Sequence, residues 1–255
     1  MILKNRVALI VGGGSGLGRA IARAFAREGA ELAVADINLD AARETLGLCQ
    51  KKEFALQADI SHPADLEDAV ARVMARFERL EILVNCAALC LVDPILDLTQ
   101  ARWDQVFNIN ARGAFFCMQA AARVMIPRRF GRIINITTPA SRLGVPYFAT
   151  YAASKAAVDS LTRSATIAWA RSGVTVNSLS PGMMTGGMID KLENELARAM
   201  GRNEEEFKAA RTNGLPMGRR VEPEEVAEAA VWLASDAAAY VSAERFNFTG
   251  GMELA

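Results

Sequence analysis

The sequence has only one histidine and four cysteines in 255 residues, whereas a zinc site needs about four clustered ligands, usually at short spacings. Cys49, Cys86, Cys90 and Cys117 form no C-x-x-C pair, and His62 has no second histidine to complete a metal site. We therefore expect no metal and no disulfide framework. If the chain is an enzyme, its general base is a residue other than histidine.

Charge of one sign and long apolar runs are also lacking. The 29 basic residues balance 29 acidic ones, whereas a protein that binds nucleic acid carries a clustered basic excess. No run approaches the roughly 18 to 20 apolar residues that span a bilayer, and residues 1–6 lack the apolar segment of a signal peptide. We expect a cytoplasmic protein that binds neither nucleic acid nor a membrane.

Short β-type runs alternate with segments of helical periodicity along the whole chain. The expected strands are 7–11, 31–36, 54–58, 82–85, 132–137, 174–178 and 245–248, and the clearest helices are 64–77, 103–125, 152–170 and 224–234. This alternation predicts an α/β fold, in which a parallel sheet is covered by helices on both faces. We predict a single domain, residues 1–255, with a lid-like helical excursion at about 183–215.

A glycine-rich turn follows the first expected strand. Gly12, Gly16 and Gly18 are spaced G-x-x-x-G-x-G before a helical segment, so the backbone can approach a pyrophosphate at a helix N-terminus. The second strand ends at Asp36, 18 positions after Gly18 and close to the ~20 expected of an acid that binds the adenosine ribose. A carboxylate there repels a 2′-phosphate, which favours NAD over NADP.

Tyr151 and Lys155 form a second pattern. Positions four apart share one face of a helix, so the phenol and the ammonium can project into one cleft. A phenol has a pKa of about 10, and lowering it by about three units takes roughly 4 kcal/mol. A nearby ammonium and an oxidised nicotinamide can supply this stabilisation, which makes Tyr151 the candidate for the general acid/base.

In combination, these motifs resemble the short-chain dehydrogenase/reductase family, in its classical form, over essentially the whole chain. The matching residues are the glycine turn, Asp59 with Ile60, Asn85 with Ala87, Asn110, Tyr151 with Lys155, Pro181 with Gly182, and Gly250 with Gly251. The resemblance implies a Rossmann-type, doubly wound parallel sheet of about seven strands. It also implies hydride transfer between NAD(H) and an alcohol or ketone, in a homotetramer or homodimer.

The resemblance further implies a role for each residue. In the catalytic set of Asn110, Thr138, Tyr151 and Lys155, Tyr151 exchanges the proton, Lys155 lowers its pKa and holds the nicotinamide ribose, and Asn110 anchors a proton-relaying water. The implied cofactor-binding set is Gly12, Ser15, Gly16, Leu17, Gly18, Asp36, Ile37, Asp59, Ile60, Asn85, Ala87, Tyr151, Lys155, Pro181, Gly182, Met184 and Thr185.

The chain departs from the family pattern at several positions. Thr138 stands thirteen positions before Tyr151, where the family has a serine, and Ser141 is the alternative hydroxyl donor. Gly186 occupies the place of a common threonine near the carboxamide, and Thr185 is adjacent to it.

The excursion and the C-terminal segment look similar to those of polyol and sugar-alcohol dehydrogenases of this family. We therefore expect oxidation of a secondary alcohol of a polyol, sugar or related diol, in a pocket built from residues 138–148 and 182–215. One alternative is a 3-oxoacyl thioester reductase with Arg128, Arg129 and Arg132 as its basic patch. The other is a non-catalytic NAD-binding scaffold or sensor.

Overall fold

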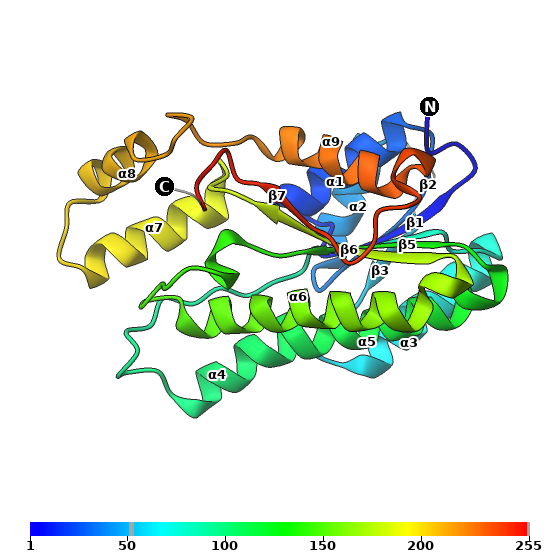
Figure 1. Cartoon of the computed structure of the whole chain (residues 1–255), viewed down its shortest axis with the longest axis horizontal. Helices are drawn as coiled ribbons and strands as arrows, with labels where there is room; N and C mark the ends of the chain where they lie inside the picture. The colour runs from blue at the N-terminus through cyan, green and yellow to red at the C-terminus, as the bar shows by residue number, and fades with distance from the viewer. Residues whose placement is uncertain (51–53, 254–255) are drawn as a thin grey trace.

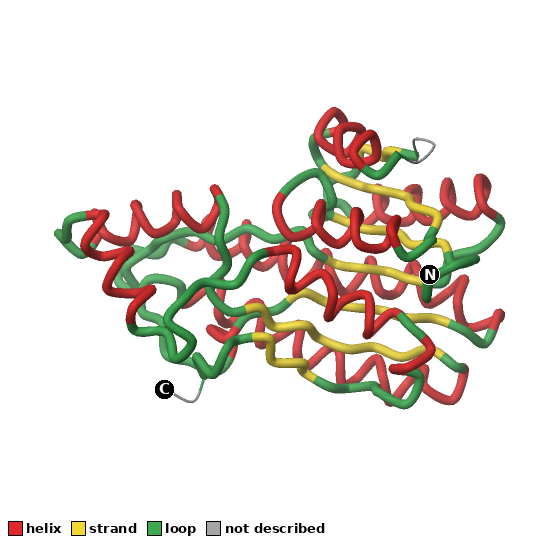
Figure 2. The backbone as a smooth tube through the Cα atoms, turned by 90° about the horizontal axis from the view of Figure 1, so that it is seen from above, coloured by secondary structure: helices red, strands yellow, loops and turns green. Residues whose placement is uncertain are grey.

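The apolar runs form one sheet of seven parallel strands. The structure, a computed structural model, describes residues 1–50 and 54–253, except for the side chains of residues 187 and 188. The strands are β1 (Val7–Val11), β2 (Glu31–Asp36), β3 (Ala55–Gln57), β4 (Ile82–Asn85), β5 (Gly131–Ile136), β6 (Val174–Pro181) and β7 (Arg245–Phe248). They lie in the order β3-β2-β1-β4-β5-β6-β7, with every neighbouring pair parallel (Figure 2). The predicted doubly wound sheet is confirmed.

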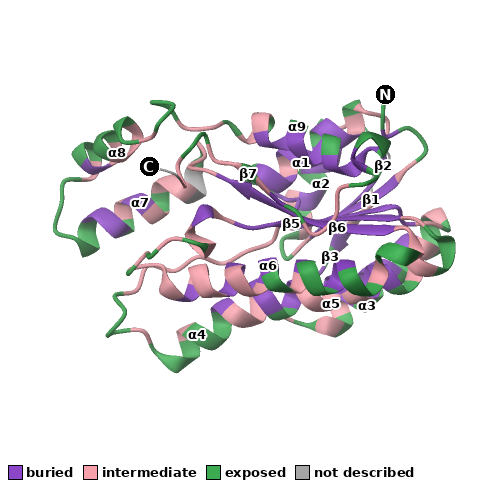
Figure 3. Cartoon of the chain, viewed as in Figure 1, coloured by how far each residue is buried: buried purple, intermediate pink, exposed green. Residues whose placement is uncertain are grey.

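Helices cover both faces of the sheet. They are α1 (Gly16–Arg27), α2 (Leu39–Leu48), α3 (Pro63–Phe77), α4 (Gln100–Phe107), α5 (Ala114–Met125), α6 (Ala149–Trp169), α7 (Gly187–Ala199), α8 (Glu204–Asn213) and α9 (Pro223–Ala234). The first, second and ninth helices lie on one face, and the third, fifth and sixth lie on the other (Figure 1). The strands are buried on both sides, as their apolar composition requires (Figure 3). No helix of the described chain is long and apolar enough to cross a membrane.

The strand order reverses direction at β1, which places a crevice at the carboxyl ends of β1 and β4. From β1 the chain passes to β2 and β3 on one side of β1, and then to β4 on the other side. In open α/β sheets such a switch point is where ligands bind. The amide of Ala87 donates to the Val11 carbonyl at 3.0 Å, so the turns that follow these two strands lie together.

The predicted helix at 103–125 is interrupted, which corrects that expectation. A π-helical turn, Asn108–Gly113, separates α4 from α5. Gly113 packs against the Ile60 carbonyl so closely that a Cβ would lie 2.5 Å from its oxygen. A single extra residue in a helical turn does not disturb hydrophobic periodicity enough to be predicted, although such turns are frequent at functional sites.

Two further boundaries differ from the prediction. Helix α6 begins at Ala149 rather than at residue 152, which brings Tyr151 into its first turn. Strand β6 continues to Pro181 because its pairing with β7 extends to Phe248.

The excursion forms α7 and α8, which lie beyond the carboxyl edge of the sheet (Figures 1 and 2). Glu193 of α7 is buried and ion-paired with Arg211 of α8 at 3.2 Å and with Arg220 at 2.6 Å. An apolar cluster of Leu196, Ala197 and Phe207 packs on Val92, Tyr147 and Phe148. The two helices are therefore held both to each other and to the loop that precedes α6.

Candidate active site

The glycine turn between β1 and α1 is shaped by close backbone approach. Gly12 has a φ of 80°, and a Cβ at this position would lie 2.4 Å from the Ala87 nitrogen. At Gly18, a Cβ would lie 2.1 Å from the Gly12 carbonyl oxygen. Ser15 caps α1 without a side-chain hydrogen bond, and a Cβ on Gly16 meets open space in the described structure. The turn thus leaves its backbone and the N-terminus of α1 accessible, and this combination is typical of a phosphate-binding site.

Asp36 ends β2 directly beside this turn. Its Oδ2 accepts the Gly14 amide at 2.9 Å, and its Oδ1 accepts the Asn38 amide at 3.0 Å. Ile37, the next residue, is exposed, and Leu17 is buried under the turn. Arg19 donates to the Gly14 carbonyl at 2.6 Å and is ion-paired with Glu44. The carboxylate of Asp36 therefore lies beside the backbone of the glycine turn. Arg19, the nearby cation in the described region, is already paired with Glu44.

The next two predicted contacts follow β3. Asp59 accepts hydrogen bonds from the amide and the hydroxyl of Ser61 at 2.8 and 2.7 Å. Ile60 is buried, with its carbonyl against Gly113. The contact between Ile60 and Gly113 joins the segment after β3 to the end of the π-helical turn that contains Asn110.

Asn85 is buried, and its side chain contacts the neighbouring elements. Its Nδ2 donates to Asn135 Oδ1 at 2.8 Å and to the Ala114 carbonyl at 3.3 Å. The side chain thus links β4 to β5 and to the start of α5.

Thr138 and Tyr151 are brought together, and Ser141 is directed elsewhere. The Thr138 hydroxyl lies close enough to the Tyr151 phenol to lower its pKa. The Ser141 hydroxyl instead donates to Asp159 Oδ2 at 2.8 Å. Of the two hydroxyls considered from the sequence, only that of Thr138 is adjacent to the phenol.

Burial dominates the pKa of Tyr151. It raises this pKa well above the ordinary value, the neighbouring Cys90 adds to the rise, and the nearby Thr138 hydroxyl opposes it. We predicted from the sequence that Lys155 lowers this pKa. That role stays a prediction; in the structure, burial has the largest effect on the phenol and raises its pKa. A working base therefore needs additional positive charge near the phenol.

Lys155 is buried, with 3% of its surface exposed. Its Nζ donates to the Ile136 carbonyl at 2.8 Å. Burial lowers the pKa of Lys155 to about 8, and the carboxylate of Asp159 acts in the opposite direction. The thiols of Cys86 and Cys90 have pKa values raised to about 12 by burial, so they are neutral at physiological pH.

Asn110 lies in the π-helical turn and is fully engaged with its surroundings. Its Oδ1 accepts the Leu89 amide and its Nδ2 donates to the Leu89 carbonyl, both at 2.8 Å. The same Nδ2 donates to Ser154 Oγ at 3.0 Å, and Ser154 donates to the Tyr151 carbonyl at 2.7 Å. Sequence reasoning missed Ser154, although it stands between the tyrosine and the lysine in the same motif.

The segment after β6 is tied to the start of α9. The Gly182 amide donates to the Phe248 carbonyl at 2.9 Å, and Met184 forms a parallel bridge with Val221. The Thr185 hydroxyl donates to Glu222. Gly186 has a φ of 122°, which disfavours a threonine at the position where the family commonly has one.

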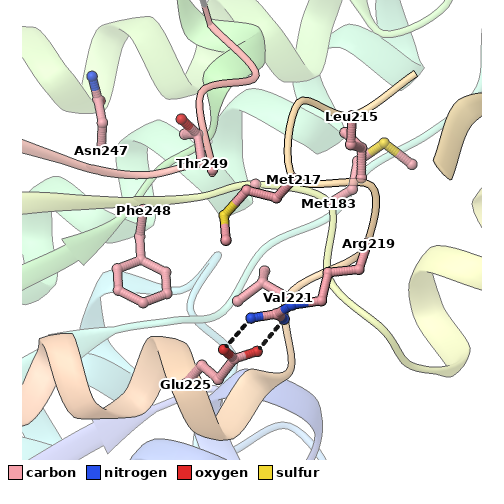
Figure 4. Close-up of a pocket in the computed structure, with 11 residues that line it drawn as sticks. Met183, Leu215, Met217, Arg219, Val221, Glu225, Asn247, Phe248 and Thr249 are labelled. Atoms are coloured by element: carbon pink, nitrogen blue, oxygen red, sulfur yellow. Dashed lines mark hydrogen bonds and ion pairs between the residues drawn. The ribbon is translucent and has the colours of Figure 1, made fainter. Parts of the chain in front are cut away.

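A cavity of about 300 Å³ lies where the lid returns to the sheet (Figure 4). Met217, Val221 and Phe248 contribute apolar side chains, and Arg219 forms a two-pronged ion pair with Glu225 at 2.7 Å for each bond. Gly182 and Met183 line it. The cavity therefore borders the segment after β6, and neither Tyr151 nor Lys155 lines it.

The arginines of the thioester alternative lie far from the lid. Arg128 and Arg129 precede the start of β5, at the amino end of the strand, and donate to the Glu78 and Arg171 carbonyls. Arg132 is buried and stacks on Phe130. In the described residues, no group of three or more metal-ligating side chains is placed to hold an ion.

The chain has extensive similarity to known oxidoreductases. Residues 12–253 match the sequence profile of a family described as "Enoyl-(Acyl carrier protein) reductase". Sorbitol dehydrogenase of Cereibacter sphaeroides is 39% identical over 98% of both chains. Galactitol 2-dehydrogenase of Agrobacterium fabrum is 37% identical, also over 98% of both. The chain belongs to the short-chain dehydrogenase/reductase family. Among solved structures, levodione reductase matches with a TM-score of 0.93 and 30% identity, covering 99% of both chains.

Membership makes the chain an oxidoreductase that uses a nicotinamide cofactor. The residues present fit such a group. The turn at Gly12 has no room for a Cβ, Gly16 leaves open space above the helix N-terminus, and Asp36 stands at the edge of that space. The sequence resemblance to this family is confirmed, as is the expectation that the chain is an enzyme.

Proposed function

We propose that the chain oxidises a secondary alcohol of a polyol, sugar or related diol with NAD⁺, as one catalytic domain over residues 1–255. The observation that carries the proposal is the Tyr151 phenol, which lies beside the Thr138 hydroxyl one helical turn before the buried Lys155. The relatives named for sorbitol and galactitol support the substrate class, because they match the whole chain.

In this proposal, each catalytic residue moves or holds a proton. Hydride exchange is the chemistry that the nicotinamide supplies when bound. Tyr151 accepts the proton of the alcohol, or returns it to a carbonyl, and Thr138 donates a hydrogen bond to the same oxygen. Lys155 keeps a positive charge one turn from the phenol. Asn110 holds Leu89 and Ser154 in place, and with them the first turn of α6.

NAD is the proposed cofactor rather than NADP. The carboxylate of Asp36 can accept hydrogen bonds from the ribose hydroxyls and repels a 2′-phosphate. Arg19, the nearest cation of the turn, is neutralised by Glu44. The residues proposed to hold the cofactor are Gly12, Ser15, Gly16, Leu17, Gly18, Asp36, Ile37, Asp59, Ile60, Asn85, Ala87, Tyr151, Lys155, Pro181, Gly182, Met184 and Thr185.

The thioester alternative has less support from this structure. Pantetheine recognition would need the arginine run near the lid, whereas the run lies at the opposite end of β5. A polyol site needs no such patch.

We also propose that the protein is a homo-oligomer. Ile167 of α6 is 84% exposed, and on α4 the partly exposed Trp103 stacks on Phe107 with ring centroids 4.6 Å apart. Large apolar side chains on neighbouring outer helices suit burial against a second subunit. Light scattering tests this, and a monomer would contradict it. The cytoplasmic location stays a prediction.

The test is a substrate panel monitored by absorbance of the reduced cofactor. Sorbitol, galactitol, smaller diols and simple secondary alcohols are offered with NAD⁺ and, separately, with NADP⁺. We expect turnover with polyols, and a higher kcat/KM with NAD⁺. Turnover restricted to 3-oxoacyl thioesters, with NADPH as the better reductant, would contradict the proposal.

A further inference from the structure

Arg245 is a charged residue inside a sheet whose strands are otherwise mostly apolar. It begins β7 and is only 7% exposed. In the sheet register, Asn85 pairs with Asn135, Asn135 with Ser178, and Ser178 with Arg245. A row of buried polar residues thus crosses four adjacent strands beneath α6 and ends at this guanidinium.

The guanidinium joins four separate parts of the active-site end. Its Nη2 donates to the Thr138 carbonyl at 2.8 Å and to Ser180 Oγ at 2.7 Å. Its Nε lies 3.2 Å from Asp159 Oδ2 of α6. Its Nη1 donates to Glu253 of the C-terminal segment at 3.0 Å. One side chain therefore fixes the Thr138 loop, β6, the catalytic helix and the C-terminal segment.

Charge and geometry make these contacts interdependent. Asp159 and Glu253 are both nearly buried, and each relies on Arg245 as a counterion. Asp159 also accepts the Ser141 hydroxyl at 2.8 Å, so the loop is held at two points, its Thr138 carbonyl and its Ser141 side chain. Asp159 follows Lys155 by one helical turn and raises the pKa of its ammonium. The cluster thus contacts the neighbours of both Tyr151 and Lys155 without reaching the phenol.

We propose that Arg245 is a positioning residue that aligns the Thr138 hydroxyl with Tyr151, with Asp159 and Glu253 holding the guanidinium in place. The proposal rests on the function proposed above, because it assigns Thr138 to the substrate oxygen. Nothing in Arg245 itself touches the reacting atoms. Its effect is to keep the Thr138 carbonyl fixed, and through it the Thr138 hydroxyl beside the phenol.

The conservative variant Arg245→Lys separates charge from geometry. A lysine keeps the counterion for the two carboxylates, but its single ammonium cannot hold Thr138, Ser180 and Glu253 in the same planar arrangement. The matched control is Arg132→Lys. Arg132 is also a buried arginine of the sheet, but it stands near the amino end of β5, remote from Thr138.

Two measurements are made on the full-length parent and both variants. Steady-state oxidation of the best polyol gives kcat and KM, with the Kd of NADH taken from fluorescence. We expect Arg245→Lys to lower kcat about tenfold, with KM and the Kd of NADH within about twofold of the parent, the loss expected for one misplaced hydrogen bond. Amide hydrogen exchange should quicken in residues 138–143 and 249–253 and not in the control.

The outcomes separate this inference from the function on which it rests. An Arg245→Lys variant with the parent's kcat and unchanged exchange at 138–143 overturns the inference and leaves the function standing. Equal losses in Arg245→Lys and Arg132→Lys would also overturn it. If the parent turns over no polyol, the proposed function fails, and the exchange measurement alone decides the positioning role. If Arg245→Lys does not fold, Glu253→Gln replaces it, with a smaller fall in kcat expected and an unchanged kcat and exchange counting against the inference.

Discussion

The ammonium of Lys155 is held under the carboxyl edge of the sheet by a 2.8 Å hydrogen bond to the Ile136 carbonyl. Burial lowers the pKa of this group from 10.5 to about 8. At neutral pH the folded protein still carries the charge, so it bears an unfavourable free energy of roughly 3 kcal/mol relative to an exposed lysine. Lys155 is thus a source of instability.

Replacing Lys155 by methionine should therefore stabilise the fold and abolish turnover. We expect the free energy of unfolding to rise by about 1–2 kcal/mol at pH 7. The unfolded chain binds more protons than the folded parent between pH 8 and 10.5, so the parent gains stability across this window and the advantage of the variant shrinks. Urea unfolding at pH 7 and pH 10.5 measures this, with the exposed Lys4→Met as control. A Lys155→Met variant less stable than the parent at pH 7 would contradict the conclusion that the buried charge of Lys155 destabilises the fold.

The charge of Asp36 should set the cofactor preference. Asp36→Asn keeps the shape of the side chain but removes the charge that repels a 2′-phosphate. We expect NADH to bind about tenfold more weakly and NADPH to bind more tightly, as for loss of a hydrogen bond to a charged group. Fluorescence titration of both cofactors measures the ratio. Asp40→Asn, an exposed neighbour on α2, should leave it unchanged, and an unchanged ratio in Asp36→Asn would argue against the ribose contact.

Substitution by alanine should change stability in opposite directions at two glycines. At Gly12 the φ is 80° and the new Cβ would overlap the Ala87 backbone, so we expect Gly12→Ala to lose at least about 2 kcal/mol of stability together with NADH binding. At Gly47, within α2, the Cβ meets open space in the described structure, so Gly47→Ala should gain about 0.5–1 kcal/mol. Thermal unfolding with and without NADH checks both. Equal effects at the two positions would refute the close approach at Gly12.

The sheet and the main site residues could be predicted because each depends on a local pattern. Strands buried on both faces are apolar runs, and a dinucleotide turn needs glycine wherever the backbone has no room for a Cβ. Tyr151 and Lys155 stand four apart on one helix, so a short stretch of sequence is enough to predict their shared face.

The remaining features depend on contacts between distant segments. Arg245 and Asp159 are 86 positions apart in the sequence, and an arginine at the start of a strand normally predicts an exposed end. The sequence did contain one indication that Arg245 is buried: it is a charged residue in a strand that we expected to be covered by helices on both faces. The raised pKa of Tyr151 likewise follows from burial, which no spacing of residues reports.

The most direct test of the account is the Tyr151→Phe variant, assayed for NAD⁺ reduction with the best polyol. Tyr240→Phe, at a fully exposed tyrosine, is the control for loss of a phenolic hydroxyl. The account predicts that Tyr151→Phe still binds NADH, within about tenfold of the parent Kd as for loss of one hydrogen bond. It should lose at least about a thousandfold in kcat, since general acid/base catalysis contributes about 10²–10⁴-fold. Turnover by Tyr151→Phe at the rate of the parent would contradict the central claim.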